Sequence, residues 1–335
     1  MQQTVLGIDI GGANLKYASS CGTAAAREFA MWLTPELLSQ SLLEDIQKHF
    51  IDHGTSPDEL AVTMTGELAD CFLDRKVGVE HIVHQTCQAA ETLAIPSVRF
   101  YGVDGRFHQA KIACESPDLI AAANWHALAN FVGREIASDA LLIDIGSTTT
   151  DIIPISGQKV ATDALTDYDR LCDGSLVYIG CRRTPVCGLV SNLEYRGIST
   201  PVMNEAFATM DDAMLLLGHT EEDASDCSSA DGKPRSRVLA ANRLARMIGL
   251  DRRTINVHDA KILAHQIIAA ATEQIAHAIQ QHHEHHTWVL SGHGQVLVSK
   301  PDGQPTLHLA DHLGNEVARC APAYAVARLK FSKTQ

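Results

Sequence analysis

The stretch LGIDIGGANLK spans Leu6–Lys16, and LLIDIGSTTTD spans Leu141–Asp151. Both contain the series Ile-Asp-Ile-Gly, followed by small polar residues and a second β-prone stretch. This pattern is typical of a buried strand, a tight turn and an antiparallel return strand. The two copies start about 135 residues apart, so they predict two similar halves, each the size of an ordinary domain.

Strand and helix patterns alternate between the two copies, which favours a mixed α/β fold. The predicted elements are a helix over 35–53, a strand over 60–65, a helix over 79–93, a strand over 97–103, and a long Ala-rich helix from Pro117 to about Ile136. Pro117 suits the first turn of a helix, where no backbone N–H is needed. We expect this long helix to connect the two halves.

The second copy is followed by a different series of elements. We expect an irregular segment over 163–197, helices over 204–217, 235–248 and 258–281, a strand over 287–290 and a closing helix over 317–330. Residues 221–234 are acidic and rich in Gly and Ser, which indicates an exposed loop. We predict domains over 1–138 and 139–335, and the closing helix is a candidate to pack back on the first domain.

The composition suits a chain of two globular domains. The 335 residues are 45% hydrophobic and 20% charged, which excludes a disordered or fibrous chain. The 27 Lys and Arg against 40 Asp and Glu give a net charge of −13, which disfavours a nucleic-acid partner. No signal segment and no run of about 18 apolar residues occurs, so no membrane partner is expected. Nine scattered Cys without a CxxC pair favour a reduced, cytoplasmic protein.

Asp9 and Asp144 each stand at the carboxyl end of a predicted strand, directly before a turn. The backbone N–H groups of such a turn can bind phosphate oxygens. A carboxylate there would repel the phosphate unless a hard cation lies between them, so we expect Mg²⁺, held directly or through water. An ordinary β-turn Asp is the alternative for either copy alone, and the duplication favours the phosphate site.

With these hairpins the chain resembles the superfamily of actin, hexokinase and the heat-shock chaperone ATPases. The resemblance implies an α/β fold of two duplicated ribonuclease-H-like, actin-like ATPase domains with a central cleft. It also implies a late glycine motif at the nucleotide base and ribose, and VLSGHG at Val289–Gly294 occupies that place. The residues concerned are Ser291, Gly292, His293 and Gly294. Because His293 replaces the small residue usual there, the use of ATP stays open.

Three further motifs narrow the resemblance. They are MTGELAD at Met64–Asp70, GSLVYIGCRRTPV at Gly174–Val186 and ADGKPRSRVLAANRLARMIG at Ala230–Gly249. They resemble the hydantoinase A/oxoprolinase branch and, more closely, proteins linked to tetrahydromethanopterin one-carbon transfer. That family includes a transferase of methanofuran biosynthesis, which couples an aminomethylfuran-methyl diphosphate to the phenol of γ-glutamyltyramine or tyramine and releases diphosphate. The resemblance therefore implies small-molecule substrates; the exact amine and the oligomeric state, a homodimer included, stay open.

This chemistry assigns roles to the residues around both turns. Asp9 and Asp144 would hold the metal, because the departing diphosphate needs Mg²⁺, backbone donors and basic side chains. The phosphate-binding candidates are Gly11, Gly12, Asn14, Gly146, Ser147, Thr148 and Thr149, with Lys16, Arg182 and Arg183 as counter-charges. Each of the three basic residues could instead be a plain exposed side chain, although adjacent arginines suit an anion-binding loop.

Two carboxylates are candidates for the general base. Glu67 follows a predicted strand and Gly66 and could accept the phenol proton; alternatively, it begins the next helix, where an acidic residue favours the helix dipole. Asp104, in YGVDG, is the candidate if the chain is a kinase, and a turn Asp before Gly105 otherwise.

Two other functions stay open beside the transferase. An ATP-dependent small-molecule kinase needs a working nucleotide site at VLSGHG, and a nucleotide- or metabolite-binding regulatory protein needs no base. The tract HAIQQHHEHH at His277–His286 is expected to be a frayed, solvated helix end rather than a metal site. Cys181 and Cys187 are too far apart in sequence for a common zinc site and are expected to be free.

Overall fold

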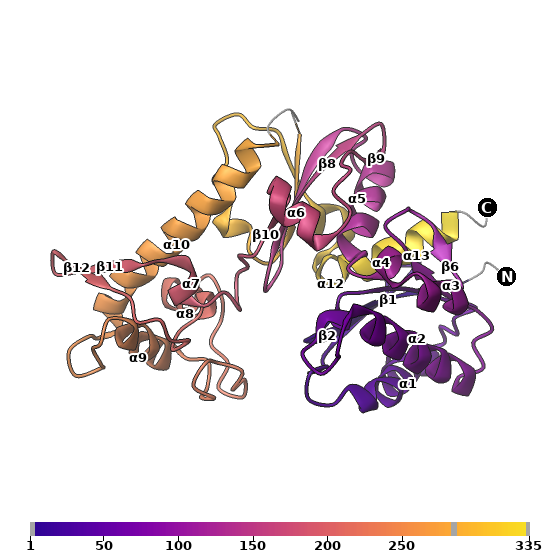
Figure 1. Ribbon diagram of the computed structural model, residues 1–335, viewed down its shortest axis with the longest axis horizontal. Coiled ribbons are helices and arrows are strands. Elements are labelled where there is room, and N and C mark those ends of the chain that lie inside the picture. The colour runs from indigo at the N-terminus through magenta and orange to yellow at the C-terminus, as the bar shows by residue number, and fades with distance from the viewer. Residues whose placement is uncertain (1–3, 283–286, 333–335) are drawn as a thin grey trace. The chain divides into compact units, whose positions relative to one another are not determined.

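The computed structural model describes residues 4–282 and 287–332 (Figure 1). It divides into two compact units. The first contains the chain up to Leu142, Ile153–Arg170 and the chain from Leu307 on; the second contains Ile143–Ile152 and Leu171–Thr306. Within the described residues, no helix is both long enough and apolar enough to cross a membrane.

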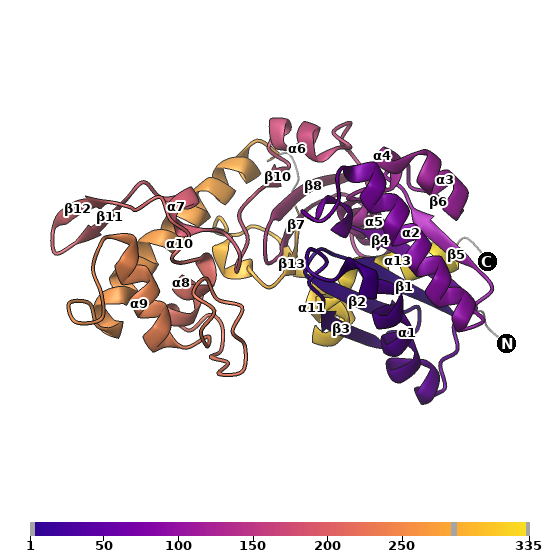
Figure 2. The same cartoon turned by 60° about the horizontal axis from the view of Figure 1, so that its bottom comes forward.

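The first sheet has six strands in the order β3-β2-β1-β4-β5-β6 (Figure 2). Their bounds are β1 Val5–Ile10, β2 Asn14–Ser19, β3 Ala24–Glu28, β4 Glu59–Met64, β5 Val98–Tyr101 and β6 Phe107–His108. β1 pairs antiparallel with β2 and parallel with β4, and the register places Asp9 opposite both Lys16 and Thr63. The row Lys16-Asp9-Thr63 therefore runs across three neighbouring strands on one face of the sheet.

Helices cover both faces of this sheet. On one face, Leu6, Ile8 and Ile10 of β1 belong to a core that includes residues of α1 (Leu38–His49) and α2 (Arg75–Thr92). On the other face, α13 (Ala321–Ser332) packs on β1 and against α5 (Asn124–Glu135). Figure 1 shows α1 and α2 on one side of β1 and α13 on the other. The closing helix thus completes the core of the first unit.

The second sheet repeats the strand order of the first. It runs β10-β8-β7-β13-β14, with β9 pairing β8. Its strands are β7 Ala140–Ile145, β8 Thr150–Ser156, β9 Lys159–Val160, β10 Leu176–Val177, β13 Trp288–Gly292 and β14 Thr306–His308. In both sheets the hairpin that carries Ile-Asp-Ile-Gly supplies the central strand and its neighbour. This correspondence confirms the prediction of a duplicated α/β fold.

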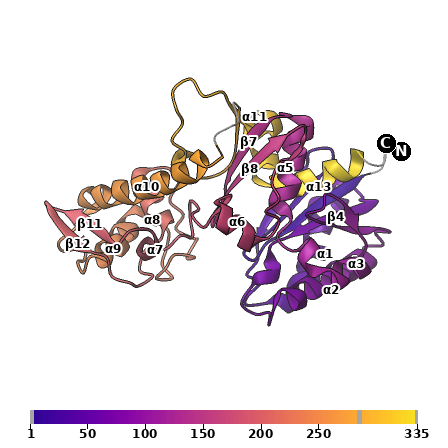
Figure 3. The same ribbon diagram turned by 45° about the horizontal axis from the view of Figure 1, so that its top comes forward.

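The second unit also contains a helical cluster (Figure 3). Helices α8 (Met210–Leu217), α9 (Arg237–Met247) and α10 (Val257–Gln280) pack together, and the hairpin of β11 (Asn192–Tyr195) and β12 (Ile198–Pro201) lies against α10. The other helices are α3 Ala110–Glu115, α4 Pro117–Ile120, α6 Asp167–Asp173, α7 Val186–Leu189, α11 Leu309–Leu313 and α12 Asn315–Arg319. Short 3₁₀ turns lie at Pro35–Leu37, Ile51–His53, Gly66–Leu68 and Gln295–Leu297.

The long helix expected from Pro117 to Ile136 is wrong in one respect, because the chain breaks between α4 and α5. Ala121 is extended and Ala122 has a left-handed φ of 48°. Alanine favours helix locally, so tertiary contacts impose the break: Ala122 N donates to the carboxylate of Glu67. The helix expected from residue 204 also begins later, at Met210, where Thr209 and Asp212 form a capping box.

Candidate functional site

The two phosphate-type turns have the same backbone hydrogen bonds. Gly11 N donates to Asn14 O at 2.9 Å, and Gly146 N donates to Thr149 O at 2.9 Å. The chain that follows the neighbouring strand is tied to the same place in each sheet. Thr65 N donates to Ile10 O at 2.9 Å, and Gly294 N donates to Ile145 O at 3.1 Å. The segment after Met64 and the late glycine motif are therefore structural counterparts, a relation not predicted from the sequence.

Asp9 is a buried carboxylate with spare hydrogen-bonding capacity. Its side chain is 6% exposed, and Lys16 Nζ lies 4.0 Å from Oδ2. Oδ1 has no hydrogen-bond partner among the described residues, and neither does the buried Oγ1 of Thr63 in the same row. Burial raises the pKa of Asp9, an effect that Lys16 only partly offsets. A carboxylate oxygen left in this state fits the oxygen ligands that Mg²⁺ prefers.

Asp144 occupies the equivalent place on β7 and lies against the late glycine motif. Gly292 has a φ of 81°, and a Cβ there would lie 2.1 Å from Ile145 O and 2.9 Å from Asp144 Oδ1. Ser291 is buried at the end of β13. Asp144, Gly146–Thr149 and Ser291–Gly294 are thus brought together within the second unit.

Replacing Gly292 by alanine is expected to destabilise the second unit. The left-handed φ strains any residue with a Cβ, and the backbone of Ile145 cannot move away as a flexible side chain would. We expect the free energy of unfolding to fall by about 2 kcal/mol or more. Gly188→Ala is the control, because a Cβ at Gly188 meets nothing within 4 Å. Thermal unfolding of both variants measures this; equal midpoints would contradict the close approach.

The arginine loop is fastened to the second turn. Cys181 N donates to Gly146 O at 3.0 Å, and the backbone N–H groups of Arg182 and Arg183 donate to Ser147 O at 3.1 and 2.8 Å. These bonds place both arginines beside the phosphate-binding candidates of β7 and β8. The loop therefore lies directly against the second turn.

The side chain of Arg182 is held by the acidic segment 221–234. Its Nη2 donates to Asp226 Oδ2 at 2.5 Å and to Ser228 Oγ at 2.6 Å. Arg235 also donates to Asp226, at 3.4 Å, and forms two hydrogen bonds with Asp211. The sequence indicated an exposed loop here, and its local composition carries no signal for this long-range contact.

Glu67 lies in the 3₁₀ turn after β4 and is fully buried. Its Oε1 accepts a hydrogen bond from Ala122 N at 3.1 Å, while Oε2 has no partner within the part of the chain that the structure describes. Burial raises the pKa of Glu67 to about 7. Glu67 thus lies in the first turn of a short 3₁₀ helix, as its alternative role predicted in part, whereas the α-helix α2 begins only at Arg75. Gly78 of α2 packs on the Glu67 backbone, where a Cβ would lie 2.2 Å from its carbonyl oxygen.

Asp104 has a different environment. Its Oδ1 accepts hydrogen bonds from Arg106 N at 3.0 Å and from His108 Nε2 at 3.1 Å. Partial burial raises the pKa of Asp104, but these hydrogen bonds outweigh it and leave the pKa below its usual range. Asp104 is therefore a weaker base than Glu67, and its two local bonds are those of a turn Asp.

The histidine tract and the cysteines were the remaining candidates for a metal site. No group of three or more His, Cys, Asp or Glu suited to a metal ion occurs among residues 4–282 and 287–332. His283, His285 and His286 lie outside the described residues. All nine cysteines are free, Cys181 and Cys187 included.

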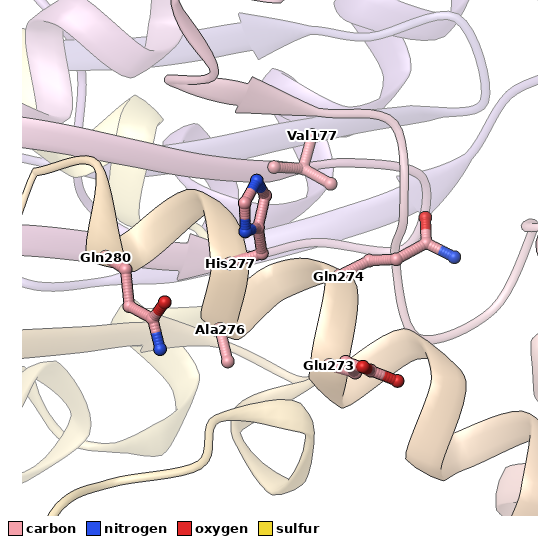
Figure 4. Close-up of a pocket in the computed structure, with 6 residues that line it drawn as sticks. All are labelled: Val177, Glu273, Gln274, Ala276, His277 and Gln280. Atoms are coloured by element: carbon pink, nitrogen blue, oxygen red, sulfur yellow. The ribbon is translucent and has the colours of Figure 1, made fainter.

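A pocket of about 570 Å³ lies along α10 (Figure 4). It is lined by Val177, Glu273, Gln274, Ala276, His277 and Gln280. None of the candidate phosphate, metal or base residues lines it, so it is separate from the site described above.

Comparisons with known proteins agree with this fold and these motifs. The model of the Hydantoinase/oxoprolinase family matches residues 58–332. The protein named (4-{4-[2-(gamma-L-glutamylamino)ethyl]phenoxymethyl}furan-2-yl)methanamine synthase of Methanocaldococcus jannaschii is 33% identical over 336 residues, covering 98% of each chain. The protein of the same name from Methanococcus vannielii is 28% identical over 211 residues, covering 60% of this chain and 95% of that one.

A solved structure supports the fold independently. Nucleotide-free acetone carboxylase matches with a TM-score of 0.53 at 11% identity, covering 98% of this chain and 70% of that chain. At this identity the similarity concerns the fold alone. The family model and the sequence relatives confirm the resemblance that the motifs predicted: the chain belongs to the hydantoinase/oxoprolinase family and, within it, to the family of the furan-methanamine synthase of Methanocaldococcus jannaschii.

Proposed function

We propose that this chain is a transferase that couples an aminomethylfuran-methyl diphosphate to the phenol of γ-glutamyltyramine or tyramine and releases diphosphate. The observation that carries the proposal is the 33% identity over 98% of the chain to a synthase whose name describes such a phenoxymethyl furan. The duplicated phosphate-type turns support it, because a diphosphate leaving group needs anion-binding groups on the enzyme.

The reaction breaks the bond between the furanylmethyl carbon and the diphosphate oxygen, and the electron pair leaves with the diphosphate. The phenol oxygen bonds to the same carbon, and the phenol proton passes to a base on the protein. The furan ring stabilises positive charge on the carbon during the exchange. No nucleotide is consumed, because the substrate already carries its leaving group.

The protein's part at the diphosphate is to bind and orient it. The backbone of Gly11–Asn14 and Gly146–Thr149 supplies hydrogen-bond donors, and Lys16, Arg182 and Arg183 supply positive charge. Asp9 and Asp144 would hold Mg²⁺, with the unpartnered Oδ1 of Asp9 as a ligand atom. When bound, Mg²⁺ neutralises charge that develops on the departing diphosphate.

Glu67 is the base in this proposal. A carboxylate whose pKa is near 7 has the basicity that proton removal at neutral pH requires, and one oxygen, Oε2, is available to accept the proton. Since Glu67 is fully buried here, the substrate complex has to open a path to Oε2. Asp104, with its lowered pKa and local hydrogen bonds, suits this role less well.

Diphosphate release tests the proposal against its rivals. With the furan diphosphate, the phenolic amine and Mg²⁺, but without nucleotide, we expect diphosphate to appear and the phenol to be consumed. A kinase would instead require ATP and release ADP, and a regulatory protein would bind ligands without turnover. Either of those results, measured by anion-exchange chromatography of the reaction mixture, would replace the transferase proposal.

A further inference from the structure

Several large apolar side chains are exposed on two neighbouring segments of the first unit. Trp32 and Leu33, which follow β3, are 40% and 69% exposed. Leu68 and Leu73, between β4 and α2, are 52% and 90% exposed. We call these four residues the apolar platform. Apolar side chains gathered in this way on loops commonly mark a binding surface.

The two segments are fastened to each other. Cys71 Sγ donates to Met31 O at 3.3 Å, and His81 Nε2 of α2 lies 2.9 Å from the carbonyl oxygen of Pro35, in the segment after β3. The four residues of the platform therefore stand on two segments that are linked to each other.

The platform adjoins the first phosphate-type turn. Met31 N donates to Gly12 O at 2.9 Å, and Phe29 N donates to Ala13 O at 3.0 Å, so Trp32 follows directly from residues bonded to that turn. On the other segment, Thr65 N donates to Ile10 O at 2.9 Å, and Leu68 ends the 3₁₀ turn that contains Glu67. A ligand with its diphosphate on this turn would have the group attached to it beside the platform.

Negative charge accompanies the apolar side chains. Glu36 and Asp70 are exposed, and each is next in sequence to a residue that links the two segments, since Glu36 follows Pro35 and Asp70 precedes Cys71. An apolar surface flanked by two carboxylates is complementary to an aromatic ring that carries an ammonium group. It is poorly suited to an anionic or purely aliphatic group.

We propose that the apolar platform binds the furan ring of the diphosphate substrate, with Glu36 and Asp70 facing its aminomethyl group. This inference rests on the proposed function for the identity of the ring. Trp32 would stack on the furan, and the leucines would remove its edges from water. The phosphate turn and the platform together would then select an aryl-methyl diphosphate over a free diphosphate.

The test compares the full diphosphate substrate with two ligands that contain only part of it. Calorimetric titrations with Mg²⁺ use inorganic diphosphate, the aminomethylfuran-methyl diphosphate, and the furanylmethyl diphosphate that lacks the aminomethyl group. For Leu33→Ser/Leu73→Ser we expect at least tenfold weaker binding of both furan ligands and unchanged binding of inorganic diphosphate. Because both leucines are mostly exposed, the fold should survive. Ile198→Ser, at a 67% exposed residue of β12, is the matched control and should change nothing.

The carboxylates are tested in the same way. Glu36→Gln/Asp70→Asn should weaken the aminomethyl ligand by about three- to tenfold and leave the furan without an amine unaffected. The proposal would be overturned if the leucine variant bound each of the three ligands as tightly as the wild type does. It would also be overturned if the variant lost as much affinity for inorganic diphosphate as for the furan ligands.

Product formation separates this inference from the proposed function. If ether forms and the leucine variant keeps the wild-type KM for the furan diphosphate, the platform proposal fails and the transferase stands. If no ether forms under any condition and the variant still loses furan binding selectively, the platform proposal stands and the transferase fails.

Discussion

Glu67→Gln is expected to slow ether formation by about 10²- to 10⁴-fold, the usual effect of removing a general base. Glutamine has the shape of glutamate and can still accept the hydrogen bond from Ala122 N, but it cannot take the phenol proton. The affinity for the furan diphosphate should change little, since Glu67 acts on the other reactant. Single-turnover rates measure the loss, and turnover within threefold of wild type would contradict the assignment.

The pH dependence of turnover gives a second test of Glu67 as the general base. Because burial raises the pKa of Glu67 to about 7, turnover of the wild type should rise with pH through that value and then level off, whereas the glutamine variant should lack this step. Asp104→Asn is the comparison. If Asp104 were the base, its lowered pKa would place the rise of turnover with pH in the acidic range, and Asp104→Asn would slow turnover instead of Glu67→Gln.

Stability separates this result from misfolding. A carboxyl whose pKa is 4.5 when unfolded and about 7 when folded favours the protonated native state, so its contribution to stability is lost as pH rises from about 4.5 through 7. Glu67→Gln removes that loss and should unfold at a temperature no lower than wild type at pH 8. If the variant is slow but at least as stable as the wild type, its slow turnover reflects the missing base and not a damaged fold.

Asp9→Asn should weaken Mg²⁺-dependent binding of diphosphate at least tenfold, or about 1.4 kcal/mol. The buried Oδ1, which has no hydrogen-bond partner in the described parts of the chain, would lose its negative charge and with it most of its attraction for a divalent cation. Because burial raises the pKa of Asp9, a proton competes with the metal, so the wild-type affinity should increase with pH. Calorimetric titration with Mg²⁺ and diphosphate measures both effects.

Asp144→Asn should have a comparable effect, since the second turn has the same backbone hydrogen bonds as the first. Asp118→Asn, at a side chain that is 80% exposed, is the control for a lost surface charge. Unchanged diphosphate binding in both the Asp9 and the Asp144 variants would refute a phosphate role for the duplicated hairpins.

The duplicated hairpins could be predicted because their information is local. A short and nearly continuous apolar run ending at Asp-Ile-Gly predicts a buried strand and a turn without any contribution from distant residues. The turn bonds of Gly11 and Gly146 follow from that local pattern. The repeated strand order involves strands far apart in the chain and was expected only from the duplication of the hairpins. The late glycine motif was predicted only through the family resemblance, and the structure adds that Gly292 has a left-handed φ beside Ile145.

The surroundings of these turns depend on contacts between distant residues, and the sequence alone does not encode them visibly. Alanine at position 122 favours helix, yet the hydrogen bond to Glu67, 55 residues away, accompanies a left-handed conformation there. Asp226 and Ser228 belong to a polar loop whose composition indicates only exposure, although they hold Arg182 across 44 and 46 residues. Thr63 looks like any β-branched residue of a strand until the register places it beside Asp9.

The most direct measurement is mass spectrometry of the product formed from the furan diphosphate and phenol-labelled [¹⁸O]tyramine or [¹⁸O]γ-glutamyltyramine, with Mg²⁺ and no nucleotide. The account predicts a phenoxymethyl furan that retains the ¹⁸O, together with one unlabelled diphosphate for each ether. Absence of the ether without ATP, accompanied by a phosphorylated hydroxyl compound and ADP when ATP is added, would contradict it.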